Sequence, residues 1–260
     1  MWVLLIIIVL LAVYLFRKLF KIPKLSNLVL VTGGVKTGKS TMSVYFAIKQ
    51  YKRSLRAWKV RKFFSFIIRK WKDEEKPLLY SNVPLAVEYV PLTLELALRQ
   101  KRFAYGSVVY IQEASLFADS MSYKDEEASE AIKLLNKLIA HETKGGCLIY
   151  DTQAVSDLSF GIKRNIQSYF YIHHSIKIPF FMICYVRELL YSPEEQGINN
   201  VFSDDVEVGL RRVIIPKRIW KKFDCYTYSA LTDDLPAVTD IVDGKKLPDL
   251  KSRSYISIKK

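Results

Sequence analysis

The sequence predicts an α/β fold: a mostly parallel central sheet flanked by helices, with one N-terminal transmembrane helix and a small β-rich C-terminal addition. Three observations favour this class. An apolar run at 27–32 leads into a glycine-rich loop and then into a segment of helical composition. Two later apolar runs, 107–114 and 147–153, end in polar residues. An uninterrupted apolar stretch, 1–16, precedes them all.

The apolar stretch at the amino end predicts a membrane anchor over 1–20. Four cations follow it at once: Arg17, Lys18, Lys21 and Lys24. A cleaved signal peptide normally carries its charge before the apolar stretch, and small residues after it. Here the order is reversed, so an uncleaved single-pass helix is expected. Because positive charge stays on the cytoplasmic side, the remainder of the chain is expected in the cytoplasm.

The glycine-rich loop has the pattern Gly-x-x-x-x-Gly-Lys-Ser between a strand and a helix, the context that defines a P-loop. Gly33 and Gly38 permit a tight turn whose backbone N–H groups converge on phosphate oxygens. Lys39 reaches the terminal phosphates, and the Ser40 hydroxyl ligates Mg²⁺. The pattern therefore predicts a site for ATP and Mg²⁺, formed by Gly33, Gly34, Val35, Lys36, Thr37, Gly38, Lys39, Ser40 and Thr41.

The run at 107–114 supplies the acidic residue that nucleotide hydrolysis requires. Glu113 follows four apolar residues and is expected to orient the attacking water as general base. Gln112 stands where an aspartate is expected. Its amide can accept a hydrogen bond from a metal-bound water but adds no negative charge. Weak Mg²⁺ binding or slow hydrolysis is the inference.

The run at 147–153 predicts a strand beside the first one. Gln153, at its end, is the candidate sensor of the terminal phosphate, or else a cap of the strand. Lys163 and Arg164 precede another strand-like run, and Arg164 is the candidate arginine finger acting across a subunit boundary. A solvated cation is the other interpretation of Arg164.

Cations are concentrated in one segment, 49–72, which holds ten Lys or Arg residues, no acidic one, and six interleaved aromatic rings. The whole chain has a net charge of +14. Such a segment suits a helix lying on an anionic membrane surface. It also suits cations for phosphates and rings for base stacking on single-stranded DNA. A solvated helix face with an apolar packing side is the third interpretation.

The domain organisation follows from these segments. A nucleotide-binding core is expected over 25–183, with the basic aromatic segment 49–72 as an insertion. A β-rich part is expected over 184–231, where two strand-like runs suggest an appended hairpin. A loosely ordered tail is expected over 232–260.

Several pieces together resemble the zonula-occludens-toxin-like (Zot-like) P-loop ATPases, which include assembly proteins of filamentous phages. They are VTGGVKTGKST (31–41), LLYSNVPL (78–85), VVYIQEA (108–114), HETKGGCLIYDTQAVSDL (141–158) with the following GIKRNIQ, and KKFDCYTYSAL (221–231), in the family's order. The resemblance implies an additional-strand P-loop core that forms rings. Matching positions are Gly33, Gly38, Lys39, Ser40, Glu113 and Gln153.

The resemblance further implies an ATPase at the inner membrane that powers phage assembly and extrusion of single-stranded DNA with other phage assembly proteins. Two features depart from the family pattern. Gln112 replaces an aspartate, and the membrane helix comes first, whereas many members place it after the ATPase domain. Two alternatives stay open: a plasmid or cellular DNA-transfer ATPase, and a nucleotide-binding membrane scaffold with little hydrolysis.

Overall fold

The computed structural model describes most of the segment between the expected anchor and the expected tail. The described residues are 22–68, 71, 73–92, 103–116, 134–137, 139, 143, 145–153, 155, 158, 160–163, 165–189, 207–220, 222 and 223, with 7, 11 and 14 as single positions. The expected anchor 1–20, apart from those three positions, and the expected tail 232–260 lie outside the described residues. Within the described part of the chain, no helix has both the length and the apolar character needed to cross a bilayer.

One eight-stranded sheet organises the described residues, in the order β3-β2-β4-β5-β1-β6-β7-β8. Its strands are β1 (Leu28–Gly33), β2 (Leu79–Ser81), β3 (Val90–Pro91), β4 (Val108–Ile111), β5 (Cys147–Thr152), β6 (Ser168–Lys177), β7 (Phe181–Leu189) and β8 (Glu207–Pro216). All pairings from β3 to β6 are parallel, and β7 and β8 are antiparallel. The predicted α/β class with a mostly parallel sheet is confirmed.

The position of β5 decides how the site is built. β5 pairs with β1 on one side and with β4 on the other, so the strand that precedes Glu113 is not adjacent to the strand that leads into the loop. The prediction that 147–153 forms a strand beside the first is confirmed. It is the additional strand that the family resemblance implies.

The predicted hairpin is formed by β7 and β8, which pair along their whole lengths. It is not a separate appendage, because β7 also pairs with β6. The two strands are joined by a tight connection at 178–180, which is closed by a hydrogen bond from the Ile178 N–H to the Phe181 carbonyl. The boundary expected at 183/184 falls inside β7. The C-terminal strands therefore extend the same sheet.

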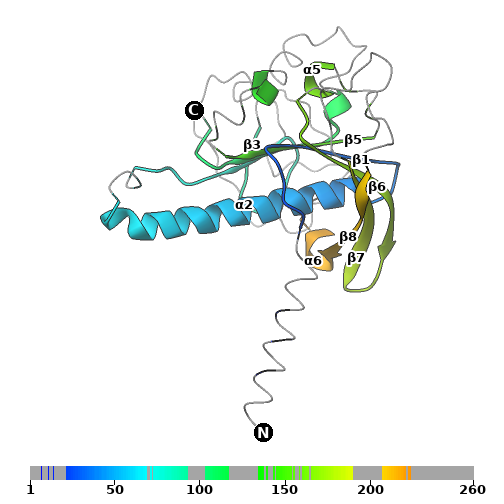
Figure 1. Ribbon diagram of the computed structural model, residues 1–260, viewed down its shortest axis with the longest axis horizontal. Coiled ribbons are helices and arrows are strands. Elements are labelled where there is room, and N and C mark those ends of the chain that lie inside the picture. Colours follow the sequence, from blue (N-terminus) through cyan, green and yellow to red (C-terminus); the bar gives the residue numbers. More distant parts are fainter. Residues whose placement is uncertain are drawn as a thin grey trace, which may run out of the picture.

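Helices lie on both faces of this sheet (Figure 1). The long helix α2 (Lys39–Phe63) covers one face and ends in the 3₁₀ turn η1 (Phe64–Phe66). The short helix α6 (Lys217–Trp220) lies on the same side and contacts α2 away from that distal end. The short helix α5 (Phe160–Lys163) lies on the opposite side, and a further 3₁₀ turn, η3 (Ala114–Leu116), follows β4.

Strand residues alternate between two apolar cores. Val29 and Val31 of β1 face α2, whereas Leu28 and Leu30 face the opposite layer. All six residues of β1 are buried, as expected of a parallel strand covered on both faces. The apolar run at 27–32 is therefore a central strand.

Helix α2 changes character half-way along. Residues 42–48 are all buried, but most side chains after Tyr51 are half-buried or exposed. Residues 49–63 of the predicted basic insertion are thus the second half of the helix that begins at the loop. Figure 1 shows this half projecting beyond the sheet.

The contact that seats α2 on the sheet gives a first prediction. Phe46 of α2 and Phe170 of β6 are both buried and meet edge to face, with centroids 5.3 Å apart. Phe46→Ala is expected to lower the free energy of unfolding by about 3–5 kcal/mol, because it leaves a cavity in this core. Phe63→Ala, the same change on an exposed part of α2, is the control and is expected to have less than about 0.5 kcal/mol of effect. Urea titrations that give the same loss of unfolding free energy for both variants would contradict a role for the Phe46–Phe170 contact in seating α2 on the sheet.

Candidate nucleotide-binding site

The loop between β1 and α2 is closed by its own hydrogen bonds. The Thr37 backbone N–H and its hydroxyl both donate to the Gly34 carbonyl, at 3.3 Å and 2.8 Å. Gly33 ends β1 where space is tight. A Cβ there would lie 2.8 Å from the Thr37 hydroxyl and 3.0 Å from the Ile172 carbonyl oxygen. A larger residue at 33 would push the loop away from β6.

Two loop residues have positive φ angles, Lys36 at 63° and Gly38 at 91°. Only glycine adopts such a conformation without strain, which explains Gly38. A Cβ on Gly38 would also meet the Met182 methyl group of β7 at 3.0 Å. The hairpin therefore forms part of the floor beneath the loop.

The loop ends where α2 begins, and this end of the helix is suited to an anion. Gly34, Val35 and Lys36 are exposed, whereas Ser40 and Thr41 are half-buried. The first turn of α2 contains no acidic residue. N–H groups at a helix start carry a partial positive charge and lack helical partners, so phosphate oxygens are favourable there.

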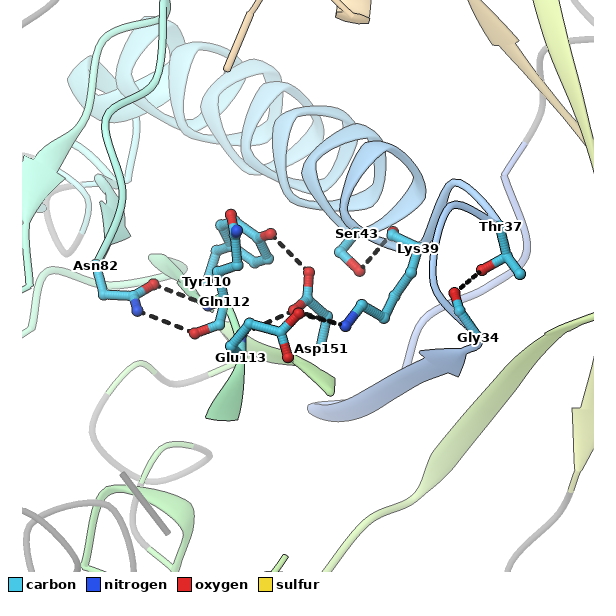
Figure 2. Close-up of polar contacts among 9 residues, drawn as sticks. All are labelled: Gly34, Thr37, Lys39, Ser43, Asn82, Tyr110, Gln112, Glu113 and Asp151. Atoms are coloured by element: carbon cyan, nitrogen blue, oxygen red, sulfur yellow. Dashed lines mark hydrogen bonds and ion pairs between the residues drawn. The ribbon is translucent and has the colours of Figure 1, made fainter. Parts of the chain in front are cut away.

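Lys39 is the centre of the polar network that Figure 2 shows. Its side chain is only 7% exposed, and its Nζ lies 2.6 Å from Glu113 Oε1 and 4.0 Å from Asp151 Oδ1. These carboxylates follow β4 and lie within β5, respectively. The structure thus brings the predicted residues Lys39 and Glu113 together, and it adds a second carboxylate.

Asp151 is fully buried and accepts two hydrogen bonds of 2.8 Å, from the Tyr110 hydroxyl and from the Glu113 backbone N–H. Burial raises the pKa of its carboxyl group, although the Lys39 ammonium and the two donors oppose that shift. Burial and the nearby Asp151 raise the pKa of Tyr110 well above its usual value. Tyr110 therefore stays protonated and serves as a donor.

Glu113 has a strained backbone, with a φ of 48° that few non-glycine residues adopt. Two interactions hold it there: its N–H bond to Asp151 and its side-chain ion pair with Lys39. Strain of this kind is retained where the surrounding structure fixes it, often at functional sites.

Gln112, the predicted contributor to the metal site, lies next to Asn82 rather than next to Lys39 (Figure 2). Asn82 follows β2 and binds both backbone groups of Gln112, accepting from its N–H at 2.8 Å and donating to its carbonyl at 3.1 Å. The Gln112 side-chain oxygen is buried without a hydrogen-bond partner among the described residues. The second carboxylate beside Lys39, in addition to Glu113, comes from Asp151 on the neighbouring strand β5.

The remaining predicted residues are not drawn into this network. Gln153 is exposed, one residue after the end of β5. Arg164 lies outside the described residues, and Lys163 ends α5. The sensor and arginine-finger roles stay predictions.

Two contributors were missed by the sequence analysis. Asp151 lies within the strand-like run 147–153, and strand alternation placed it on the same face as Ile149, the face toward α2. Asn82 follows an apolar strand, as functional polar residues do at the carboxyl edge of parallel sheets. The sequence showed that both residues lie in or just after strand-like runs, but only the strand order shows what they contact.

The residues present fit a nucleotide-bound Mg²⁺ better than a free one. Within the described residues, no group of three or more His, Cys, Asp or Glu side chains could hold a metal ion. Mg²⁺ typically uses one or two protein oxygens and takes its other ligands from phosphates and water. The Ser40 hydroxyl and the carboxylate of Asp151 or Glu113 are oxygens of the right kind.

A central strand, a glycine loop with its lysine, and an acidic residue two strands away now stand together. This is a P-loop NTPase fold.

Comparison with solved structures finds distant likenesses. The chain is similar to the N-terminal domain of zonular occludens toxin from Neisseria meningitidis, with 14% identity, a TM-score of 0.41, and coverage of 77% of this chain and 100% of that one. It is similar to the genome packaging NTPase of Sulfolobus turreted icosahedral virus 2 in complex with ATP-gammaS: 14% identity, TM-score 0.34, coverage 62% and 96%. A KaiC-like protein from Pyrococcus horikoshii has 15% identity, TM-score 0.32, and coverage 64% and 85%.

The Zot-like family named from the motifs is thus represented among the similar P-loop structures. No protein-family model and no curated protein matches the chain. Because the structural likenesses are distant, the function of this P-loop protein has to be inferred from the site itself.

The raised pKa of Asp151 gives a prediction for stability. Its folded-state pKa lies above the unfolded value, so the folded protein holds this proton more tightly and loses stability as pH rises through that interval. Asp151→Asn keeps an acceptor for Glu113 and offers Tyr110 an amide. The variant is therefore expected to become more stable relative to the original protein as pH rises from acid to neutral.

Urea unfolding of both proteins at a series of pH values measures this difference. Because every other titrating group is common to the two proteins, the difference reports on Asp151. A difference that is independent of pH would show that the Asp151 pKa is not raised.

Proposed function

We propose that this chain is a membrane-tethered ATPase of the Zot-like type that powers the assembly and extrusion of filamentous phage and its single-stranded DNA through the inner membrane. The observation that carries the ATPase assignment is the 2.6 Å contact between Lys39 and Glu113 at the edge of the sheet where the loop ends. The contact supports a role for Lys39 as the cation that binds the terminal phosphates and a role for Glu113 as the general base beside them. The tether is the apolar segment 1–20.

The Lys39–Glu113 ion pair is proposed to be the state of the site before nucleotide binds, the resting state. Lys39 is nearly buried, so its charge needs a partner, and Glu113 supplies it. The terminal phosphates of ATP compete for Lys39. When Lys39 turns to phosphate, Glu113 is released to accept a proton from water, while Asp151 keeps the Glu113 backbone in place.

Bound Mg²⁺ would supply neutralisation of charge that develops on the phosphate oxygens. Ser40 would hold it directly, and Asp151 or Glu113 through water. Gln112 adds no charge, so the predicted effect of its substitution, weaker metal binding or slower turnover, stays part of the proposal.

Assembly and substrate belong to the same proposal. The protein would form a homo-oligomeric ring with ATP at its subunit interfaces, where Arg164 of one subunit approaches the nucleotide of the next. Single-stranded DNA would be gripped electrostatically and without sequence preference. Other phage assembly proteins would be its partners at the membrane.

A nucleotide-binding membrane scaffold with little hydrolysis is the second candidate. Gln112 favours it, because the residue before Glu113 lacks a charge and its side-chain oxygen is buried. The scaffold and the proposed ATPase would both bind nucleotide, so the two candidates differ only in the rate of ATP hydrolysis.

Hydrolysis separates these candidates. Lys39→Ala and Glu113→Gln are each expected to lower the rate of phosphate release at least about 100-fold, because they remove charge stabilisation and the general base. Lys177→Ala, an exposed lysine on β6, is the control and should retain full activity. Phosphate release by the detergent-solubilised protein that equals the Lys39→Ala background would favour the scaffold.

Nucleotide binding should respond to Glu113 in the opposite direction. Glu113→Gln removes the carboxylate that competes with phosphate for Lys39. The variant is therefore expected to bind a fluorescent ATP analogue several-fold more tightly, while Lys39→Ala binds it more weakly. If Glu113→Gln binds no more tightly than the original protein, the resting ion pair does not oppose nucleotide binding.

A further inference from the structure

One face of α2 presents an unbroken row of cations, which we call the cationic stripe: Lys49, Lys52, Arg53, Arg56 and Lys59. Spacings of three and four residues place these side chains on one side of a helix. All are exposed except Lys49, which is half-buried. Helix α2 contains no acidic residue. The stripe therefore has no compensating charge on its own helix.

The opposite face of α2 is attached to the body of the protein. Tyr51 is buried, the Trp58 indole donates to the Glu74 carbonyl at 3.1 Å, and Arg61 forms an ion pair with the Glu74 carboxylate. Glu88 is engaged by Tyr51 and by Lys76. The nearby carboxylates are thus used on the side away from the stripe.

Helix α6 adds further positive charge to the stripe. The pKa values of Lys49 and Lys52 are lowered first by partial burial and then by repulsion from Arg218 of α6 and from Arg56. Lys222, just after α6, acts on Lys52 in the same way. Cations that repel one another in this manner are stabilised by an external anion.

The distal end of the helix is apolar. Its large exposed side chains, between 40% and 75% exposed, form what we call the apolar tip: Val60, Phe63, Phe64, Phe66, Ile67 and Ile68. Phe63 contacts the rings of Phe64 and Phe66 edge to face. A soluble surface rarely exposes so many adjacent apolar side chains unless they bind something. Val60 and Phe63 continue the same helix face as the stripe.

The first described residues after the expected anchor lie near α6. Ile22 and Leu25 are partly buried and pack against the same core cluster as Trp220 of α6 and Phe223. Figure 1 shows the described chain starting near α6, on the side of α2 that faces away from the sheet. The expected anchor 1–20 would therefore precede a segment that packs against the same core cluster as α6, the helix whose Arg218 lies near Lys49 and Lys52.

We propose that the cationic stripe and the apolar tip bind the surface of a bilayer that contains anionic phospholipid. Lipid phosphates meet the cations, and the tip enters the boundary between headgroups and acyl chains. Val60, Ile67 and Ile68 favour a lipid occupant over nucleic acid, because aliphatic side chains suit acyl chains and offer no ring for bases to stack on.

This surface is independent of nucleotide hydrolysis and goes beyond the proposed ATPase function. A tether alone would leave the domain free to rotate about the membrane normal and to tilt. A second contact of about 15 residues along α2 would fix how the nucleotide site is oriented relative to the bilayer.

The test labels single cysteines in the full chain. Cys225→Ser removes one native cysteine, and Cys147 and Cys184 are retained because they are buried. Phe66→Cys carries an environment-sensitive NBD label in the tip. Phe180→Cys, an equally exposed phenylalanine at the β6–β7 connection, carries the same label as the control. Both proteins are reconstituted into phosphatidylcholine vesicles with or without phosphatidylglycerol.

The label at 66 is expected to brighten about threefold or more and to be quenched by nitroxide lipid only in the vesicles with phosphatidylglycerol. The label at 180 is expected to stay unchanged. Lys52→Gln/Arg53→Gln/Arg56→Gln should lower the lipid-bound fraction of the tip about tenfold. The same response in a Lys39→Ala background would separate this surface from the ATPase proposal.

Three outcomes would overturn the inference. The first is equal emission of the label at 66 in both kinds of vesicle, and the second is an unchanged response of that label in the triple variant. The third is a response of the label to a single-stranded oligonucleotide in detergent without a response to vesicles, which would show that the stripe binds nucleic acid.

Discussion

A single nearly buried ammonium group, Lys39 Nζ, constrains the geometry of the whole site. Because a buried charge is costly without partners, the start of α2 must lie where carboxylates can reach it. Glu113 from the end of β4 and Asp151 from β5 meet that requirement. Their positions in turn require β5 to lie between β1 and β4, and they require Glu113 to adopt a backbone angle that it would otherwise avoid.

The antiparallel hairpin is part of this arrangement as well. Its strands extend the sheet on the far side of β1, and the Met182 side chain lies directly beneath Gly38. The Ser175 hydroxyl of β6 would also lie 3.2 Å from a Cβ at that position. The C-terminal strands therefore support the phosphate loop from below, and a change in the hairpin would be transmitted to the loop by direct contact.

The sequence predicted the parts of the site that follow from local pattern. The loop, the strand before it and the role of Lys39 depend on a short motif in its proper context, and Glu113 depends on the end of an apolar run. Asp151 was missed because its role depends on strand order and register: it matters only once β5 lies beside β1 and turns that residue toward α2. Asn82 was missed for the same reason, since its bonds to Gln112 join segments 30 residues apart. The basic segment was assigned to an insertion because composition alone does not show that a helix continues beyond its buried half.

Helix α2 is one continuous element of 25 residues, about 37 Å long, with the phosphate loop at its start and the apolar tip at its end. A straight rod converts a small rotation at one end into a large displacement at the other. Tilting it by about 10° about Lys39 would move the far end by about 6 Å, more than one helical turn. The orientation of this one helix therefore links the direction in which the phosphate loop faces to the position of the apolar tip.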